Sequence, residues 1–160
     1  MFNTLRPRKH AEADLTNVKY LVFCKRRKMN IENIMLDNHK ARGVFSLAKK
    51  IDIGTGYLIF VSGRQAPKGE DGRVVTDDVA QQTRLVFEDI NKILNAAGAS
   101  LDDVVKAVIY LTDLNDFSII SSIRDEYFKN SMPTSTMVEV NRMNRPGAKI
   151  EIEVTAVIKK

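Results

Sequence analysis

The stretch that decides the fold closes the chain, where residues 147–160 have the sequence GAKIEIEVTAVIKK. Ile150, Ile152 and Val154 alternate with Glu151 and Glu153, and the alternation continues towards the end of the segment. A period of two in largely β-branched residues predicts a half-buried β-strand. Its second face carries two carboxylates about 7 Å apart. That face meets solvent, a cleft or a partner subunit, and the pattern alone leaves these alternatives open.

The length and composition are those of one ordinary globular domain, with 160 residues, 44% of them hydrophobic and 28% charged. No stretch approaches the roughly 20 apolar residues of a membrane-spanning helix, so we expect no membrane segment. Cys24 is the only cysteine and there are two histidines, which excludes an internal disulfide and argues against a zinc site. This cysteine usage fits a reducing compartment, and we expect the cytoplasm.

The net charge of +5 comes from the front of the chain. Residues 1–28 hold eight basic and two acidic residues, a net of +6, whereas residues 29–160 hold 17 basic and 18 acidic residues, a net of −1. Because residues 29–160 are nearly neutral, their charge does not predict a nucleic-acid-binding face. We expect residues 1–40 to be a basic N-terminal extension and residues 41–160 to form the domain. A mitochondrial presequence is a second interpretation of the extension, and Glu12 and Asp14 count against it.

The body of the chain alternates between strand and helix patterns. Two strands, at 43–53 and 57–63, flank the turn GTG and predict a hairpin. The remaining elements expected are a helix that begins near Thr76 or Asp77 and stops at Gly98, a strand at 104–112, a helix from Asn115 or Asp116 to before Pro133, and strands at 134–142 and 149–158. The apolar stripes expected to face the core are Val79, Thr83, Val86, Ile90, Ile93 and Leu94 in the first helix, and Ile119, Ile120, Ile123 and Phe128 in the second.

The resulting order ββαβαββ, with one sheet and two helices, predicts a two-layer α+β domain with both helices on one face. The other face of the sheet is then left without a covering layer. Alternation along the last two strands predicts that this bare face carries Lys149, Glu151, Glu153, Ser135, Met137 and Glu139.

Four stretches resemble the Rid family, also called the YjgF/YER057c/UK114 or endoribonuclease L-PSP family: YLIFVSGRQAP, the segment DVAQQTRLVFEDINKILNAAGASLDDVVKAVIYLTDLNDF, PTSTMVEV and GAKIEIEVTAVI. The resemblance covers about residues 41–160. It implies a chorismate-mutase-like subunit, with one mixed sheet and two helices, that assembles as a homotrimer with clefts between subunits. The best-known members hydrolyse reactive enamines and imines to keto acids and ammonia, so the resemblance implies neither a metal nor a cofactor.

The resemblance also assigns candidate site residues. Glu151 corresponds to the carboxylate proposed to position or activate the attacking water, and Ser62 and Gly63 correspond to the family's "SG" pair. Phe45 replaces the family's tyrosine and lacks its hydroxyl, and Ser121 stands where an asparagine is often found.

The main departure is at Ser135, which occupies the place of the arginine that grips the substrate carboxylate. Each such charge-assisted hydrogen bond contributes roughly 1.5–3 kcal/mol, so we expect weaker binding of imino acids. Arg64, two residues after Ser62, and Lys149 are alternative cations for the same cleft. Met137 is expected as an apolar neighbour of the carboxylate.

Three functions follow from these residues. We favour a metal-free, deaminase-like hydrolase that acts on imines, enamines or related small metabolites, with Glu151 as base or water-positioning group. A trimer that binds a small metabolite without turnover is the alternative, which the missing arginine favours. An endoribonuclease or translation inhibitor is the third, and the neutral body and the absence of an aromatic stacking platform argue against it.

Overall fold

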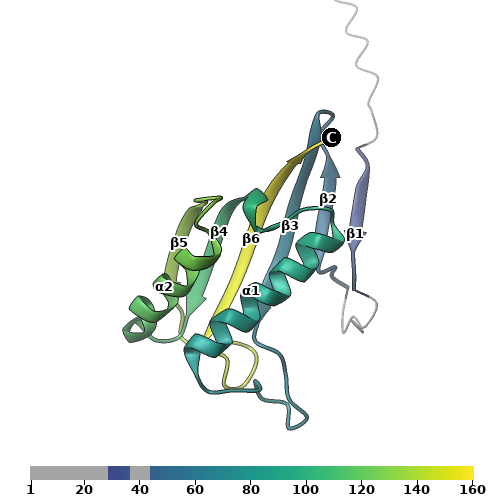
Figure 1. Cartoon of the computed structure of the whole chain (residues 1–160). Helices are drawn as coiled ribbons and strands as arrows, with labels where there is room; N and C mark the ends of the chain where they lie inside the picture. The colour runs from purple at the N-terminus through teal and green to yellow at the C-terminus, as the bar shows by residue number, and fades with distance from the viewer. Residues whose placement is uncertain (1–28, 37–43) are drawn as a thin grey trace, which may run out of the picture.

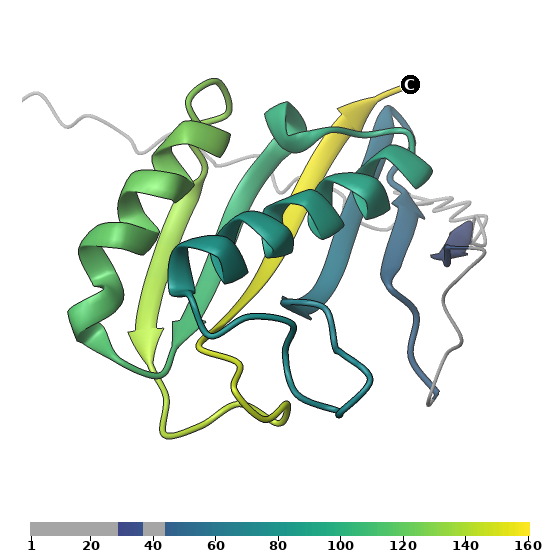
Figure 2. The same cartoon turned by 60° about the horizontal axis from the view of Figure 1, so that its bottom comes forward.

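The computed structural model describes residues 29–36 and 44–160, and these form a two-layer α+β domain. A mixed six-stranded sheet, in the order β1-β2-β3-β6-β4-β5, carries both helices on one face and leaves the other bare (Figures 1 and 2). The predicted fold class is therefore confirmed. The elements are β1 Ile31–Ile34, β2 Ala48–Asp52, β3 Gly56–Gln65, α1 Val79–Ala96, η2 Leu101–Asp103, β4 Val104–Leu111, η3 Leu114–Asp116, α2 Phe117–Tyr127, β5 Thr134–Glu139 and β6 Ile150–Lys159.

Strand β6 lies at the centre of the sheet, antiparallel to β3 on one side and to β4 on the other. Its predicted alternation is confirmed, because Ile150 and Ile152 are fully buried whereas Glu151 is half-buried and Glu153 exposed. The buried face of β6 packs beneath α1. The two carboxylates thus lie on the face that no helix covers.

Strand β1 was not predicted. Its four residues pair antiparallel with β2 at the edge of the sheet, and Ile34, opposite Ala48, joins the main core. The sheet therefore reaches back into the segment expected to be an extension. This strand was missed because four residues are too few to show a period. Residues 1–28 of that segment lie outside the described residues.

Helix α1 buries the whole predicted stripe, and Phe87 adds to it. Its N-cap is Asp78 rather than Thr76 or Asp77, because the Asp78 carboxylate accepts the N–H of Ala80 at 2.8 Å. The Thr76 hydroxyl instead accepts the N–H of Asp78 itself, at 3.2 Å, which turns the chain into the helix. Capping signals thus located the helix start to within two residues.

Helix α2 buries Ile120, Ile123 and Phe128 as predicted. Ile119 was wrongly placed in the core, since it is 45% exposed. One residue along a helix is a rotation of about 100°, which carries Ile119 away from its buried neighbour Ile120. The end of α2 is fixed to α1 by Phe87, whose ring stacks on Tyr127 at a centroid distance of 4.6 Å.

Strand β5 presents the opposite faces from those predicted. It pairs in parallel with β4, and Ser135 lies beside Ala107 and Met137 beside Ile109, two fully buried residues under the helices. Neighbouring residues in paired strands point to the same face, so Ser135, Met137 and Glu139 lie on the helix side and not on the bare face. The sequence of β5 has polar residues on both faces, which left its orientation undetermined.

Truncation tests the role of β1. Removing residues 1–28 should leave the melting temperature nearly unchanged, because that segment lacks a hydrophobic period. Removing residues 1–36 should lower the free energy of unfolding by about 1.5–3 kcal/mol, because it exposes the site of the Ile34 side chain and the edge of β2. Thermal and urea unfolding of the two truncated chains measure both effects. Equal stability of the two would show that β1 contributes nothing.

Candidate functional site

A bulge in β3 organises the candidate site. The register of β3 against β6 shifts between Val61 and Arg64, so that Ser62 and Gly63 together face one residue, Glu153. A bulge adds one residue to a strand and moves the residues after it to the faces opposite to those that simple alternation predicts. The predicted Ser-Gly pair is thus the point at which β3 changes the direction of its side chains.

The Glu151 carboxylate lies against the backbone of Gly63. A Cβ atom built on Gly63 would stand 2.9 Å from Cδ and 3.1 Å from Cγ of Glu151, and closer still to its Oε1. A Cβ atom here would force the carboxylate to move, so glycine is what admits the carboxylate in this position. The structure therefore brings together Glu151 and Gly63, two of the candidate site residues.

Gln65, which the sequence analysis missed, holds the other side of the carboxylate. Its Nε2 donates to Glu151 Oε2 and, at 2.8 Å, to Oδ1 of Asn144 in the loop between β5 and β6. The side chain is 8% exposed, and its Oε1 is buried without a partner among the described residues. In the sequence, the only sign of this role is that Gln65 is a polar residue at the end of an apolar strand. Its side-chain direction could not be predicted, because it depends on the bulge.

Arg64 does not enter the cleft, contrary to one sequence expectation. Its Nε donates to Oδ2 of Asp89 on α1 at 2.6 Å, and both side chains are largely buried. The bulge explains the difference, because Arg64 pairs in register with the buried Ile152 and so turns to the helix side. Lys149, the other candidate cation, donates its backbone N–H to Gln82 Oε1 at 2.9 Å.

Arg145, also missed, lies in the loop that supplies Asn144. Its Nη1 donates to the backbone carbonyl oxygens of Ala66 and, at 3.4 Å, of Gln65. Burial lowers the pKa of the Arg145 guanidinium, the nearby charge of Arg64 lowers it further, and Asp89 and Glu151 act in the opposite direction. A cation therefore lies at the same end of the sheet as the Glu151 carboxylate.

Ser62 has both of its hydrogen-bond donors engaged. Its hydroxyl donates to the Ser46 carbonyl oxygen and its N–H to the Leu47 carbonyl oxygen, each at 2.9 Å. The first contact fixes the chain next to Phe45, whose ring is 54% exposed and lines a neighbouring hollow with Asn33. Ser62 therefore anchors the segment before β2, and its hydroxyl proton is not directed at the cleft.

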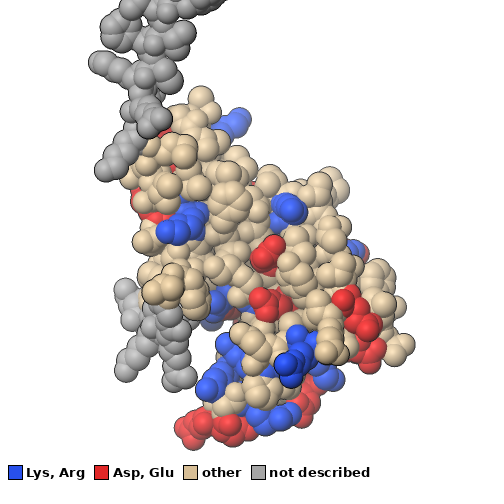
Figure 3. Space-filling model, turned by 180° about the vertical axis from the view of Figure 1, so that it is seen from behind, with Lys and Arg blue, Asp and Glu red and all other residues tan. Residues whose placement is uncertain are grey.

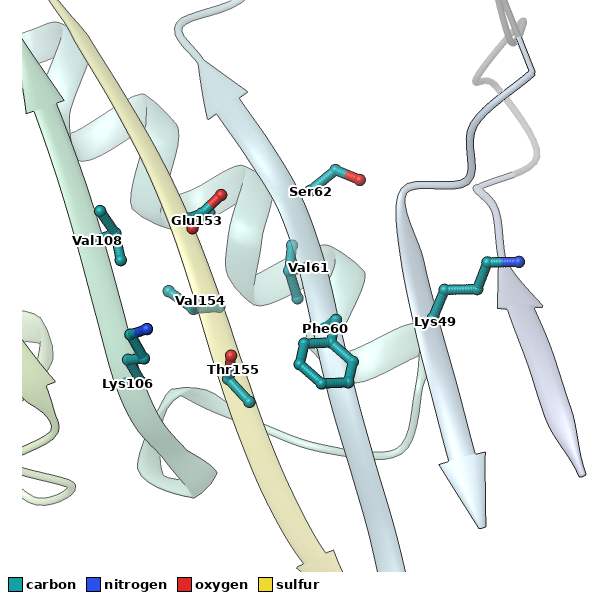
Figure 4. Close-up of a pocket in the computed structure, with 9 residues that line it drawn as sticks. All are labelled: Lys49, Phe60, Val61, Ser62, Lys106, Val108, Glu153, Val154 and Thr155. Carbon is teal, nitrogen blue, oxygen red and sulfur yellow. The ribbon is translucent and has the colours of Figure 1, made fainter. Parts of the chain in front are cut away.

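A shallow hollow of about 270 Å³ crosses the bare face beside this site. Figure 4 shows that it extends across β2, β3, β6 and β4, with Lys49 and Lys106 on its two sides. Seen as a surface, the bare face is mostly uncharged, with many charged side chains at the end that carries the long loops and others over its middle (Figure 3). The residues that line the hollow are Lys49, Phe60, Val61, Ser62, Lys106, Val108, Glu153, Val154 and Thr155.

Ser135 and Met137 form a second group, on the helix side of β5. Ser135 lines a cavity of about 390 Å³ together with Arg124 and Lys129, and Met137 packs against the main core. The Ser121 hydroxyl is buried without a partner among the described residues. Since this group is on the helix side and Glu151 is on the bare side, one copy of the chain does not bring the predicted set into a single site.

Residues 29–36 and 44–160 contain no group of three or more His, Cys, Asp or Glu side chains placed to hold a metal ion. None of their helices has the length and apolar character needed to cross a membrane.

Comparison with known proteins gives consistent matches. The family model described as endoribonuclease L-PSP matches residues 37–158. A RutC family protein of Pyrococcus abyssi is 43% identical over 117 residues, which are 73% of this chain and 88% of that protein. The human 2-iminobutanoate/2-iminopropanoate deaminase is 32% identical over 117 residues, 73% of this chain and 82% of that protein. The crystal structure of E. coli TdcF with bound serine is 33% identical, with a TM-score of 0.63 and coverage of 74% and 91%.

The contact between Glu151 and Gly63 predicts a coupled pair of substitutions. Gly63→Ala should reduce the free energy of unfolding by about 1–3 kcal/mol, because the new methyl group meets the carboxylate. Adding Glu151→Ala should restore most of that loss, because it removes the atoms that collide. Urea unfolding of the two single variants and the double variant measures the coupling. Gly69→Ala, in a surface turn, is the control, and additive effects of Gly63→Ala and Glu151→Ala would contradict the observed contact.

Proposed function

Because the chain belongs to the endoribonuclease L-PSP family, also known as the Rid or YjgF family, we propose that it is a metal-free hydrolase of small reactive imines or enamines. The observation that carries this proposal is the orientation of the Glu151 carboxylate, which lies over Gly63 and receives a hydrogen bond from Gln65. A carboxylate fixed on both sides and only half-buried is suited to orient a water molecule and take its proton.

The reaction needs one water molecule and no other reactant. With the imine protonated at nitrogen, Glu151 accepts a proton as the water oxygen bonds to the imine carbon, which gives a neutral carbinolamine. Glu151 then passes this proton to the amine nitrogen and takes up the hydroxyl proton as the carbon–nitrogen bond breaks, so that the products are a carbonyl compound and ammonia. Proton transfer by a positioned side chain typically accelerates such steps by about 10²–10⁴-fold.

We propose that the complete cleft lies between copies in a homotrimer. The two groups of predicted residues support this, because Glu151 on the bare face can meet the Ser135 group only if that group belongs to another copy. The contact would join two different surfaces, and such contacts form closed rings when the rotation between copies permits. Exposed apolar side chains on the bare face, among them Phe60 and Val157, also support burial by a neighbour.

The substrate proposed is a small imino acid or a related electrophile. The names of two relatives point to this class, one a 2-iminobutanoate/2-iminopropanoate deaminase and the other crystallised with serine. Ser135 offers a neutral hydroxyl to a substrate carboxylate, and this favours a trimer that binds such a metabolite without turnover as the second candidate function. The near-neutral charge of residues 29–160 argues against the ribonuclease activity in the family's description.

The assembly is tested by light scattering coupled to size exclusion. The expected mass is about 54 kDa, three times the 18.1 kDa of the chain. A stable monomer at micromolar concentration would sink the shared-cleft model.

The role of the carboxylate is tested with two matched substitutions on β6. Glu151→Gln keeps the shape and removes the basicity, so turnover should fall at least about 100-fold while the oligomer is retained. Glu153→Gln, two residues further on the same face and exposed, should keep nearly full activity. The assay supplies 2-iminopropanoate generated in the reaction mixture and measures the ammonia released. Equal losses in both variants would show that the charge of the face, and not Glu151, is responsible.

The missing arginine is tested by Ser135→Arg in the same assay. The substitution should raise turnover of 2-iminopropanoate, because a guanidinium binds a carboxylate with two charge-assisted hydrogen bonds. Absence of turnover in both wild type and Ser135→Arg, with a metabolite still bound, would favour the binding protein over the hydrolase.

A further inference from the structure

The Arg145 guanidinium is a partly buried cation without an acidic partner. Its Nη1 donates to two backbone carbonyl oxygens, and across the described part of the chain no carboxylate lies within 4.0 Å of it. Its Nε and Nη2 make no hydrogen bond to any described residue. Buried or partly buried charges in proteins are generally paired, so this arginine retains the capacity to bind an anion.

The neighbouring charges increase that capacity. Arg64 is already paired with Asp89 at 2.6 Å, and the two side chains nearly neutralise each other. Among the described cations at the end of β3, Arg145 is therefore the one without a carboxylate within 4.0 Å, and Glu151 acts on it only from farther away. An anion at Nε and Nη2 would offset its charge without breaking a contact that the structure shows.

A second unsatisfied group lies beside it. The amide nitrogen of Gln65 is shared between Glu151 and Asn144, and both contacts require an N–H donor, which fixes the orientation of the amide. The opposite atom, Oε1, is an acceptor that is buried and unpaired among the described residues. A buried acceptor without a donor costs free energy, and a ligand N–H would recover it.

We propose that Arg145 and Gln65 form, with Glu151, a subsite for a small molecule that carries both a carboxylate and an N–H group. The carboxylate binds Nε and Nη2 of Arg145, the N–H donates to Gln65 Oε1, and Glu151 lies next to the bound nitrogen. The inference rests on the proposed function and deepens it. Arg145 supplies the cationic grip that Ser135 cannot, and the ligand class is a 2-imino or 2-amino acid.

The test measures equilibrium binding to the full chain by calorimetry or NMR. L-alanine supplies both groups, propanoate only the carboxylate, and ethylamine only the N–H donors. L-alanine should bind more tightly than either fragment. Arg145→Ala should weaken L-alanine and propanoate by roughly tenfold or more, and Arg145→Lys should restore part of the loss. Gln65→Met should weaken L-alanine several-fold and leave propanoate unchanged.

The competing grip lies in the other cavity, where Arg124 is the arginine beside Ser135. Arg124→Ala should weaken propanoate far less than Arg145→Ala does, and Arg84→Ala, at an exposed arginine of α1 paired with Glu126, is the control that should leave both affinities unchanged. If Arg124→Ala weakens propanoate and the Arg145 variants do not, the grip is in the Ser135 cavity and the proposal is wrong. Absence of L-alanine and propanoate binding to the wild-type chain would also overturn it. If Arg145→Ala does not fold, the affinities of Arg145→Lys for L-alanine and propanoate are compared with those of the wild-type chain instead.

The outcomes that would reject the hydrolase differ from those that would reject the Arg145 subsite. Glu151→Gln should abolish turnover while propanoate still binds, since its contact is with Arg145. Binding that depends on Arg145 without any turnover in the wild type would retain the subsite and reject the hydrolase.

Discussion

The pairing of β6 between β3 and β4 is the constraint on which the rest of the structure depends. Ile150, Ile152 and Val154 must face the core beneath α1, and this places Glu151 and Glu153 on the side that no helix covers. Because the side-chain period of a strand is two, no change of register by one residue could keep both the core and the carboxylates in place. The position of the candidate site is thus fixed by the same burial that stabilises the sheet.

The bulge in β3 turns this general arrangement into a specific one. Without the extra residue, Arg64 would follow Ser62 onto the bare face and Gln65 would point to the core. With it, Arg64 pairs with Asp89 on α1, and Gln65 is free to bind Glu151. The bulge thus exchanges a cation for a neutral donor beside the carboxylate. With Arg64 held on the helix side, the proposed carboxylate-binding cation comes from the loop that carries Arg145 instead.

The fold could be predicted from the sequence, because the long amphipathic patterns in α1 and β6 each identify one buried face. Less of the candidate site could be predicted. The orientation of β5 was predicted incorrectly because its short sequence is polar on both faces, so the direction of Ser135 was set by the pairing with β4. The roles of Gln65 and Arg145 depend on a bulge and on loop contacts whose partners are 79 or 80 positions apart in the sequence, and neither feature produces a period. Local pattern thus predicted elements, whereas long-range register decided which side chains meet.

We propose that Glu151, with Gly63 and Gln65, acts together with Ser135 only across the boundary between two copies. The direct test mixes chains carrying Glu151→Gln with chains carrying Ser135→Trp, whose large side chain should fill the cavity beside α2. Each homo-oligomer should be inactive towards 2-iminopropanoate. In a randomly mixed oligomer about a quarter of the shared clefts combine two intact groups, so the account predicts recovered ammonia release after subunit exchange. No recovery, with exchange verified by native mass spectrometry, would show that both groups act within one copy and would contradict the account.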